Sequence, residues 1–373
     1  MGTLYIHIPF CLSKCRYCDF LSAPAPEDLQ RRYVQALLKD IQWQWSAFPE
    51  RIEAIFIGGG TPSLLARGIW QGLLQGILDL SDGSVKEWTV EANPGDLSEG
   101  LLQDWRAAGV NRLSMGVQSF DDETLRLLGR RHTAGQARAA YAMARKAGFE
   151  NINLDLMYGL PGMQLANWQK TVQEALALAP DHLSLYGLIV EEGTPMASDI
   201  SSGILPEPSE ETARQAFLWQ REALARAGYA AYEISNFTQP GYACRHNQNY
   251  WALGNWLGCG LGASGHLKGS FTRMSADMDA YLARLEAGQL PIDDRESWDR
   301  PTLMSETVIL ALRTTEGLSA RAFAARYGER FEQRFAAAVD VALQQKLAVW
   351  DGDYFKPTPE GLLLNNTLGL LFL

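Results

Sequence analysis

Strand-like and helix-like segments alternate along the first 230 residues, and this alternation constrains the fold more than any other feature of the sequence. An apolar run at residues 3–8 predicts a first strand, and residues 27–45 carry apolar side chains at helical spacing. Five more strand-like runs follow, separated by helical stretches, at residues 52–57, 87–92, 112–117, 151–157 and 182–190. Such alternation implies a parallel sheet covered by helices, either closed into a barrel or open and doubly wound.

Polar residues and glycines at the strand ends decide between these two architectures. Cysteines follow the first strand, a Gly-Gly-Gly-Thr-Pro turn at residues 58–62 follows the second, and Glu91 and Gln118 end the third and fourth. Asp155 lies within the fifth strand. A shared face built from many strand ends is typical of a barrel. We therefore predict an α/β fold, a partial (β/α)6 TIM-like barrel whose lateral opening admits a large ligand.

The composition changes near residue 298. Helical stretches around residues 303–311, 319–327 and 330–345 precede a hairpin at residues 347–356, which turns at Asp351-Gly352. These features predict a small helical, winged-helix-like domain. Its mixed charges favour packing or partner binding over DNA binding. The expected division is a core barrel at 1–230, a connecting segment at 231–297 and a C-terminal domain at 298–373.

Charge and hydropathy exclude several classes of protein. The chain has a net charge of -10, which argues against a nucleic-acid partner because phosphate binding requires clustered Lys and Arg. No apolar run is long enough to cross a bilayer, and the N-terminus does not resemble a signal peptide. Three of the five cysteines fall within eight residues, unlike a secreted disulfide framework. We therefore predict a cytoplasmic protein.

The cysteine pattern Cys11-x3-Cys15-x2-Cys18 predicts metal ligation. Three thiolates on one tight loop suit three irons of a cubane cluster and leave the fourth iron open. Zinc is the alternative, but a structural zinc site takes four ligands. His7, Cys244 and Cys259, which would have to supply the fourth, lack the close paired spacing of such sites.

Two carboxylates and the glycine turn add to this pattern. Glycines after a strand let backbone groups approach a ligand closely, although such turns are common. Glu91 and Asp155 lie on otherwise apolar strands, where burial is costly unless the carboxylate is hydrogen-bonded. Ribose hydroxyls could satisfy either residue, and so could a neighbouring loop.

In this order, the cysteine loop, the Gly-Gly-Gly-Thr-Pro turn and the Glu-x-Asn-Pro strand end resemble those of radical S-adenosylmethionine (SAM) proteins. More narrowly, the chain resembles the coproporphyrinogen III dehydrogenase group and its heme-chaperone branch, HemW, over nearly its whole length. This resemblance implies a [4Fe-4S] cluster on Cys11, Cys15 and Cys18, with SAM on the open iron. It also implies a set of SAM-site residues, namely Tyr5, Tyr17, Gly59, Gly60, Thr61, Glu91, Gln118, Arg130 and Asp155.

Simpler interpretations of three of these residues stay open. Tyr5 could be a core aromatic residue, Gln118 a strand-end cap and Arg130 an ordinary solvated basic residue beside Arg131 and His132.

Three features favour the chaperone branch over the dehydrogenases. Dehydrogenases of the group usually carry another cysteine two positions after the third cluster cysteine, where this chain has Phe20. They also have a longer N-terminal segment before the residue that matches Tyr5. Residues 244–251 resemble the His-Asn-x-x-Tyr-Trp motif of the chaperone branch, a motif that has been linked to heme. The implied heme candidates are His246, Tyr250, Trp251 and Cys244, although a lone histidine among aromatics is more often structural.

Three hypotheses follow. The favoured one is a heme chaperone that binds the cluster, SAM and heme and delivers heme to hemoproteins; a homodimer and peripheral membrane contact are further expectations. The alternative is an oxygen-independent coproporphyrinogen III dehydrogenase, which would decarboxylate propionates to give protoporphyrinogen IX. The missing cysteine puts that activity in doubt. A radical SAM enzyme acting on RNA is the third, and the acidic charge counts against it.

Overall fold

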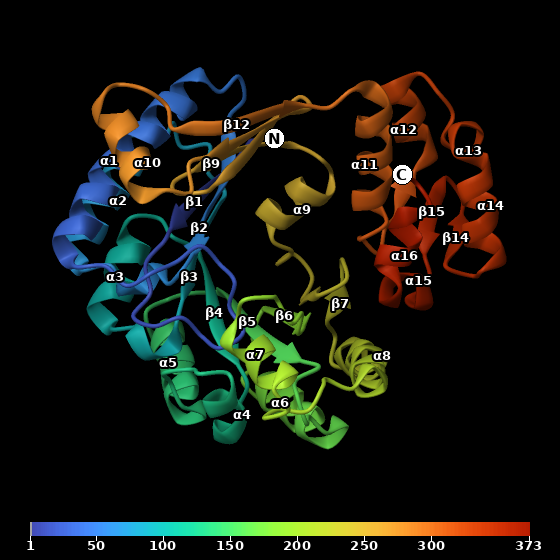
Figure 1. Cartoon of the computed structure of the whole chain (residues 1–373), viewed down its shortest axis with the longest axis horizontal. Coiled ribbons are helices and arrows are strands. Elements are labelled where there is room, and N and C mark those ends of the chain that lie inside the picture. The colour runs from blue at the N-terminus through green and yellow to red at the C-terminus, as the bar shows by residue number, and fades with distance from the viewer. Residues whose placement is uncertain (1) are drawn as a thin grey trace.

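The computed structural model describes residues 2–373. Six parallel strands pair in chain order and form the centre of one curved sheet (Figure 1). They are β1 (Gly2–Ile8), β2 (Ile52–Gly59), β3 (Glu87–Ala92), β4 (Arg112–Gln118), β5 (Asn151–Tyr158) and β6 (His182–Gly187). The strands are buried almost throughout because helices cover one face and the other face lines the barrel interior.

The helices between the strands lie outside the sheet (Figure 1). They are α1 (Glu27–Ala47), α2 (Arg67–Leu80), α3 (Glu99–Ala107), α4 (Asp122–Leu127), α5 (Ala134–Lys146) and α6 (Leu165–Ala177), and α7 (Pro195–Ser201) and α8 (Glu210–Arg226) follow β6. Their starts are encoded locally. At α5, for example, Thr133 and Gln136 form a reciprocal capping box. Large side chains on the inner helix faces fill the space against the sheet, as Trp70 and Trp105 do with ring centroids 5.1 Å apart.

The sheet continues beyond both edges of the six parallel strands. On one side β9 (Asn255–Cys259) pairs parallel to β1 and is followed by β10 (Ser264–Leu267), β11 (Ser270–Met274) and β12 (Ile292–Ser297); on the other, β8 (Asn236–Thr238) and β7 (Ala230–Ala231) follow β6. Helix α10 (Met278–Glu286) packs beside α1. The incomplete barrel is confirmed, and most of residues 231–297 extend its sheet.

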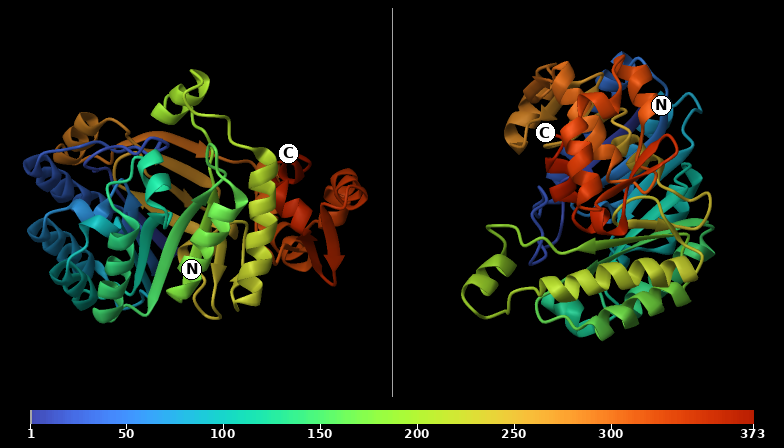
Figure 2. Two further views of the ribbon diagram at one scale, coloured as in Figure 1. Left: turned by 90° about the horizontal axis from the view of Figure 1, so that it is seen from below. Right: turned by 90° about the vertical axis from the view of Figure 1, so that its right-hand side faces the viewer.

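The side of the barrel between the two sheet edges is occupied by α9 (Arg245–Trp251), which contacts β1, β2 and the C-terminal domain (Figure 1). Figure 2 shows the C-terminal domain, in red, packed beside the barrel rather than enclosed by it. The domain comprises α11 (Arg300–Ala311), β13 (Leu318–Ser319), α12 (Ala320–Tyr327), α13 (Phe331–Arg334), α14 (Ala336–Gln344), β14 (Ala348–Asp351), β15 (Tyr354–Pro357), α15 (Pro359–Leu363) and α16 (Asn365–Leu370).

The C-terminal domain has its own core. Phe323, Phe331, Phe335, Phe355 and Phe372 pack together, separately from the apolar cluster of the barrel. The predicted hairpin is present as β14 and β15, and β13 adds a third strand, which gives the helical, winged-helix-like architecture expected. The division at residues 230 and 297 stays a prediction. Across residues 2–373, no helix is long and apolar enough to cross a membrane.

Candidate functional site

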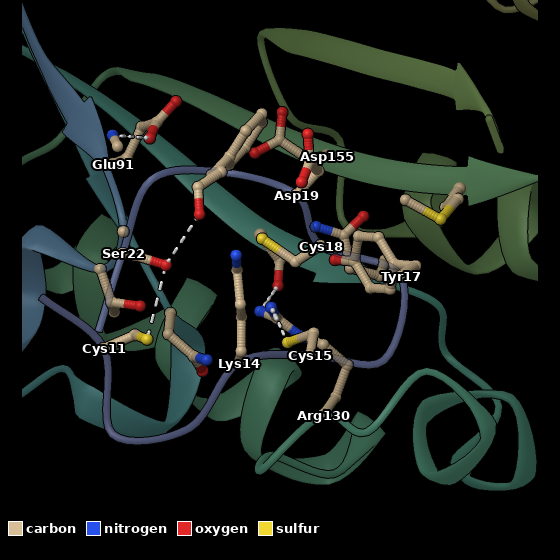
Figure 3. Close-up of a pocket in the computed structure, with 18 of the residues that line it drawn as sticks. Cys11, Lys14, Cys15, Tyr17, Cys18, Asp19, Ser22, Glu91, Arg130 and Asp155 are labelled. Carbon is tan, nitrogen blue, oxygen red and sulfur yellow. Dashed lines mark hydrogen bonds between the residues drawn. The ribbon is translucent and has the colours of Figure 1, made fainter. Parts of the chain in front are cut away.

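The three clustered cysteines lie on the loop that leaves β1. They are free thiols; Cys11 is buried, and Cys15 and Cys18 are partly exposed. All three line a cavity of about 440 Å³ at the carboxyl ends of the strands, here called the cysteine cavity (Figure 3). The same cavity is lined by Tyr17, Gly59, Gly60, Thr61, Glu91, Gln118, Arg130 and Asp155. The fold therefore brings together every residue of the implied cluster and SAM site except Tyr5.

The glycine turn after β2 is needed for packing against the cysteine loop. The backbone N–H of Gly60 donates to Ile8 O at 2.8 Å, and that of Thr61 donates to Phe10 O at 2.7 Å. A Cβ on Gly60 would lie 2.6 Å from Phe10 O, and Gly59 has a φ of +113°. Only glycine fits both constraints, so the turn fixes the start of the cysteine loop as well as lining the cavity.

Glu91 and Asp155 face the barrel interior from β3 and β5. Burial, together with the nearby charge of Asp155, raises the pKa of Glu91 to about 8. The Glu91 carboxylate accepts a hydrogen bond from the Gly59 backbone N–H at 3.1 Å, and Asp155 accepts from Asn153 at 2.7 Å and from Ser114 at 3.3 Å. Both carboxylates thus have structural partners while also lining the cavity.

Gln118 reaches the cavity from the end of β4, and Arg130 reaches it from the segment after α4. Arg130 Nη1 lies 3.5 Å from Cys15 Sγ, and its Nη2 donates to Gly116 O (Figure 3). Gln118 has a φ of 66°, and its buried side-chain Oε1 has no hydrogen-bond partner within the described part of the chain. The simple interpretation of Arg130 as a solvated residue is wrong. The unpartnered Gln118 oxygen lies where a ligand could donate to it.

A second cavity, of about 770 Å³, lies between the barrel, α9 and the C-terminal domain. It contains His246, and we call it the His246 cavity. Its walls include Tyr5, Phe56, Tyr158, Tyr186, Glu233, His246, Tyr250, Trp251, Arg313 and residues 362–367. Tyr5 therefore lies here rather than in the cysteine cavity, with its hydroxyl 3.0 Å from His7 Nδ1.

His246 is buried within an aromatic wall. Its ring centroid lies 5.1 Å from that of Phe56 and 5.1 Å from that of Tyr250. Burial lowers the pKa of His246 to about 3, so the imidazole is neutral near pH 7. Its Nδ1 is buried and has no hydrogen-bond partner among the residues that the structure describes.

Glu87 on β3 holds α9 in position. Its carboxylate accepts from the Arg245 backbone N–H at 3.0 Å and from that of His246 at 3.4 Å, and it lies 3.4 Å from Cys244 Sγ. Glu87 therefore caps α9 from a different element, since Cys244 at the N-cap position makes no side-chain capping bond. Cys244 is fully buried behind the helix, and burial raises the pKa of its thiol to about 12.

With this geometry established, comparison with known proteins identifies the family. The Radical SAM superfamily matches residues 5–175, and the HemN C-terminal domain matches residues 299–364. A protein named heme chaperone HemW from Lactococcus lactis is 35% identical over 100% of this chain and 97% of its own length. One of the same name from Escherichia coli is 37% identical, over 100% and 98%. The chain belongs to the HemW family of radical SAM proteins.

A solved structure supports the fold of this HemW-family chain. Coproporphyrinogen III oxidase (HemN) from Escherichia coli superposes with a TM-score of 0.87, covering 100% of this chain and 89% of its own, at 23% identity. At that identity the likeness establishes the shared barrel and C-terminal domain.

Membership of the radical SAM family implies a [4Fe-4S] cluster and SAM, and the cysteine cavity suits them. Within residues 2–373, no three histidine, cysteine or acidic side chains converge on a point where one metal ion could bind. A cubane does not need such convergence because each thiolate binds its own iron. Three free thiols and the unpartnered Gln118 oxygen therefore fit the implied groups.

Several residues of the two cavities were not predicted from the sequence. Ser114 and Tyr186 line the cysteine cavity, and Lys14 points into it from between the cysteines (Figure 3). Strand alternation offered a signal for Ser114, because it lies on the same face of its strand as the predicted site residue Gln118. No local signal marks Arg313 in the His246 cavity, since it comes from another domain.

Proposed function

We propose that this HemW-family chain is a heme chaperone, which binds heme in the His246 cavity and delivers it to recipient hemoproteins. The relatives named heme chaperone HemW support this proposal through identity over the full chain. The cavity volume of about 770 Å³ falls within the usual range for cofactor sites, and six aromatic side chains in its wall offer faces on which a flat porphyrin can pack.

The observation that carries the proposal is the state of His246. A structural histidine in a core normally has its ring nitrogens hydrogen-bonded. The His246 ring makes no such bond among residues 2–373, and burial keeps it neutral through its lowered pKa of about 3. A neutral imidazole with a free nitrogen is the form that ligates heme iron. We therefore assign His246 as the axial ligand, with Tyr250 and Trp251 packing on the porphyrin.

Cys244 is a weaker candidate for the iron ligand. A thiolate is needed for ligation, but burial raises the pKa of Cys244 to about 12, and its sulfur contacts Glu87 instead of the cavity. The ring centroids of Tyr5 and His246 lie 6.2 Å apart, and both residues line the His246 cavity, so we assign Tyr5 to the heme site.

The cysteine cavity would bind the [4Fe-4S] cluster and SAM. We assign the [4Fe-4S] cluster to Cys11, Cys15 and Cys18, and the SAM site to Tyr17, Gly59, Gly60, Thr61, Glu91, Gln118, Arg130 and Asp155. When bound there, the cluster would supply an open iron for SAM to coordinate. Arg130 beside Cys15 would offset thiolate charge, and the protonated form favoured by the raised pKa of Glu91 could donate as well as accept hydrogen bonds. Membrane contact, dimerisation and cytoplasmic location stay predictions.

The test is a hemin titration of anaerobically reconstituted protein, followed by assay of the same sample with SAM, dithionite and coproporphyrinogen III. We expect stable hemin binding, and transfer to an apo-hemoprotein, without decarboxylation. His246→Ala should weaken binding by on the order of tenfold or more and shift the Soret band. Cys244→Ser should leave both unchanged. Formation of protoporphyrinogen IX without stable hemin binding would show that the chain is a dehydrogenase instead.

A further inference from the structure

The C-terminal domain contributes a cation to the His246 cavity. Arg313 follows the last turn of α11 and lines the cavity wall opposite the barrel strands. Its guanidinium lies over the ring of Trp251 on α9, with Cζ 5.0 Å from the ring centroid. This cation–π contact holds the side chain against the cavity without using its hydrogen-bond donors.

Most of those donors have no hydrogen-bond partner among residues 2–373. A guanidinium has five N–H groups, and Arg313 makes one long bond, from Nη1 to Asn365 Oδ1 at 3.4 Å. Its Nε is buried and unpartnered, and no carboxylate of the described chain forms an ion pair with it. Leaving a partly buried cation unpaired costs free energy, which a carboxylate from outside the chain would recover.

The nearest acidic group in the cavity does not fill this role. Glu233 lines the same wall, but its carboxylate accepts the Ser235 backbone N–H at 3.1 Å. Burial raises the pKa of Glu233, which disfavours its charged form, while the nearby charge of Arg313 acts in the opposite direction. The two side chains therefore interact at a distance without forming an ion pair. Asn366 and Thr367 line the cavity close in sequence to Asn365 and are further polar groups at this end.

We propose that Arg313 binds a propionate carboxylate of the tetrapyrrole. This rests on the proposed heme function and adds a second recognition element to it. His246 would bind the iron, its aromatic neighbours would pack on the apolar ring, and Arg313 would bind a carboxylate at the edge of the tetrapyrrole. An arginine suits this task because its planar fork matches a carboxylate bidentately. The cavity would then select tetrapyrroles by their acid side chains as well as by their metal.

The proposal predicts a specific pairing between residue and ligand. The full-length protein is titrated with hemin and with hemin dimethyl ester, which lacks the free carboxylates. Wild-type protein should bind hemin at least about tenfold more tightly than the ester, as loss of a charged hydrogen bond implies. Arg313→Gln should weaken hemin binding by a similar factor and leave ester binding unchanged. Arg313→Lys should recover part of the preference.

The matched control is Arg334→Gln. Arg334 belongs to the same domain and lies over Phe335 at 5.1 Å, but it is exposed and outside the cavity. It should change neither affinity. Equal weakening of hemin and ester by Arg313→Gln would overturn the proposal and make Arg313 a packing residue between Trp251 and the C-terminal domain. Failure of wild-type protein to bind either ligand would instead refute the heme function.

Discussion

At the scale of single residues, the barrel interior concentrates acidic groups where water is scarce. Glu91 and Asp155 lie on neighbouring faces of the same cavity, and each is disfavoured as an anion by burial, which raises both pKa values. Such perturbed carboxyls are typical of ligand sites because a bound ligand can supply the missing hydrogen bonds.

The raised pKa of Glu91 predicts a pH-dependent stability. A carboxyl whose pKa is higher in the folded state holds its proton more tightly there, so its contribution lowers stability as pH rises from about 4.5 to about 8. We expect Glu91→Gln to match wild type near pH 4.5 and to exceed it by about 1–3 kcal/mol at pH 8.5, measured by urea unfolding of apoprotein. Parallel stability curves across this range would contradict the prediction.

The glycine turn makes a second prediction at this scale. Gly60→Ala would place a Cβ 2.6 Å from the Phe10 carbonyl oxygen, a backbone atom that moves only if the cysteine loop moves. We expect lower iron and sulfide content after reconstitution and a loss of about 1–3 kcal/mol in stability. Gly68→Ala on α2 is the control, because its Cβ would meet nothing within 4 Å. Equal cluster content in the two variants would show that the turn does not set the loop.

At the scale of elements, α9 is the part of the molecule most dependent on its surroundings. Seven residues are too few for a stable isolated helix, so α9 persists through its contacts with β1, β2 and α11 and through the carboxylate of Glu87. The helix carries His246, Tyr250 and Trp251, so its placement determines whether these residues line the cavity.

Removing the external cap should therefore disturb the His246 cavity. Glu87→Ala leaves the Arg245 and His246 amides without their acceptor, and we expect a loss of about 1–3 kcal/mol in stability together with weaker hemin binding. Glu87→Gln keeps one acceptor oxygen and should retain more of both. As a control, Glu123→Ala on exposed α4 should change stability by no more than about 0.5 kcal/mol. Unchanged hemin affinity in Glu87→Ala would show that α9 is positioned by packing alone.

At the scale of the whole molecule, the barrel and the C-terminal domain each have their own core, although Leu362 of α15 packs into the barrel core, and the two units share the wall of one cavity. Barrel strands and α9 supply one side, and Arg313 with residues 362–367 supplies the other. A ligand bound there would touch both units and couple them, because it binds best when the two are correctly placed.

Hemin should therefore stabilise the two units together. At a concentration about 100-fold above Kd, we expect about 2.7 kcal/mol of added stability and slower amide hydrogen exchange in both α9 and residues 362–367. Helices α12 and α14, which do not line the cavity, provide the internal control. Protection restricted to α9 would mean that the ligand does not reach the C-terminal domain.

The sequence by itself determined the elements and the cluster loop. Six strand-like runs and the Asp351-Gly352 turn are local patterns, set by side-chain periodicity and backbone preference, and they predicted the partial barrel and the hairpin. The cysteine spacing and the glycine turn are equally local. The resemblance to radical SAM proteins that these two motifs carry implied the cluster and SAM-site residues, and all of these but Tyr5 line one cavity in the structure.

Only the tertiary structure decided which distant residues share an environment. It placed Tyr5 in the wall of the His246 cavity, Arg130 beside Cys15 and the Cys244 thiol against Glu87. It also brought Arg313 from the C-terminal domain onto Trp251. Burial, pKa and unpaired donors depend on contacts between segments far apart in the chain, and no local pattern encodes those contacts.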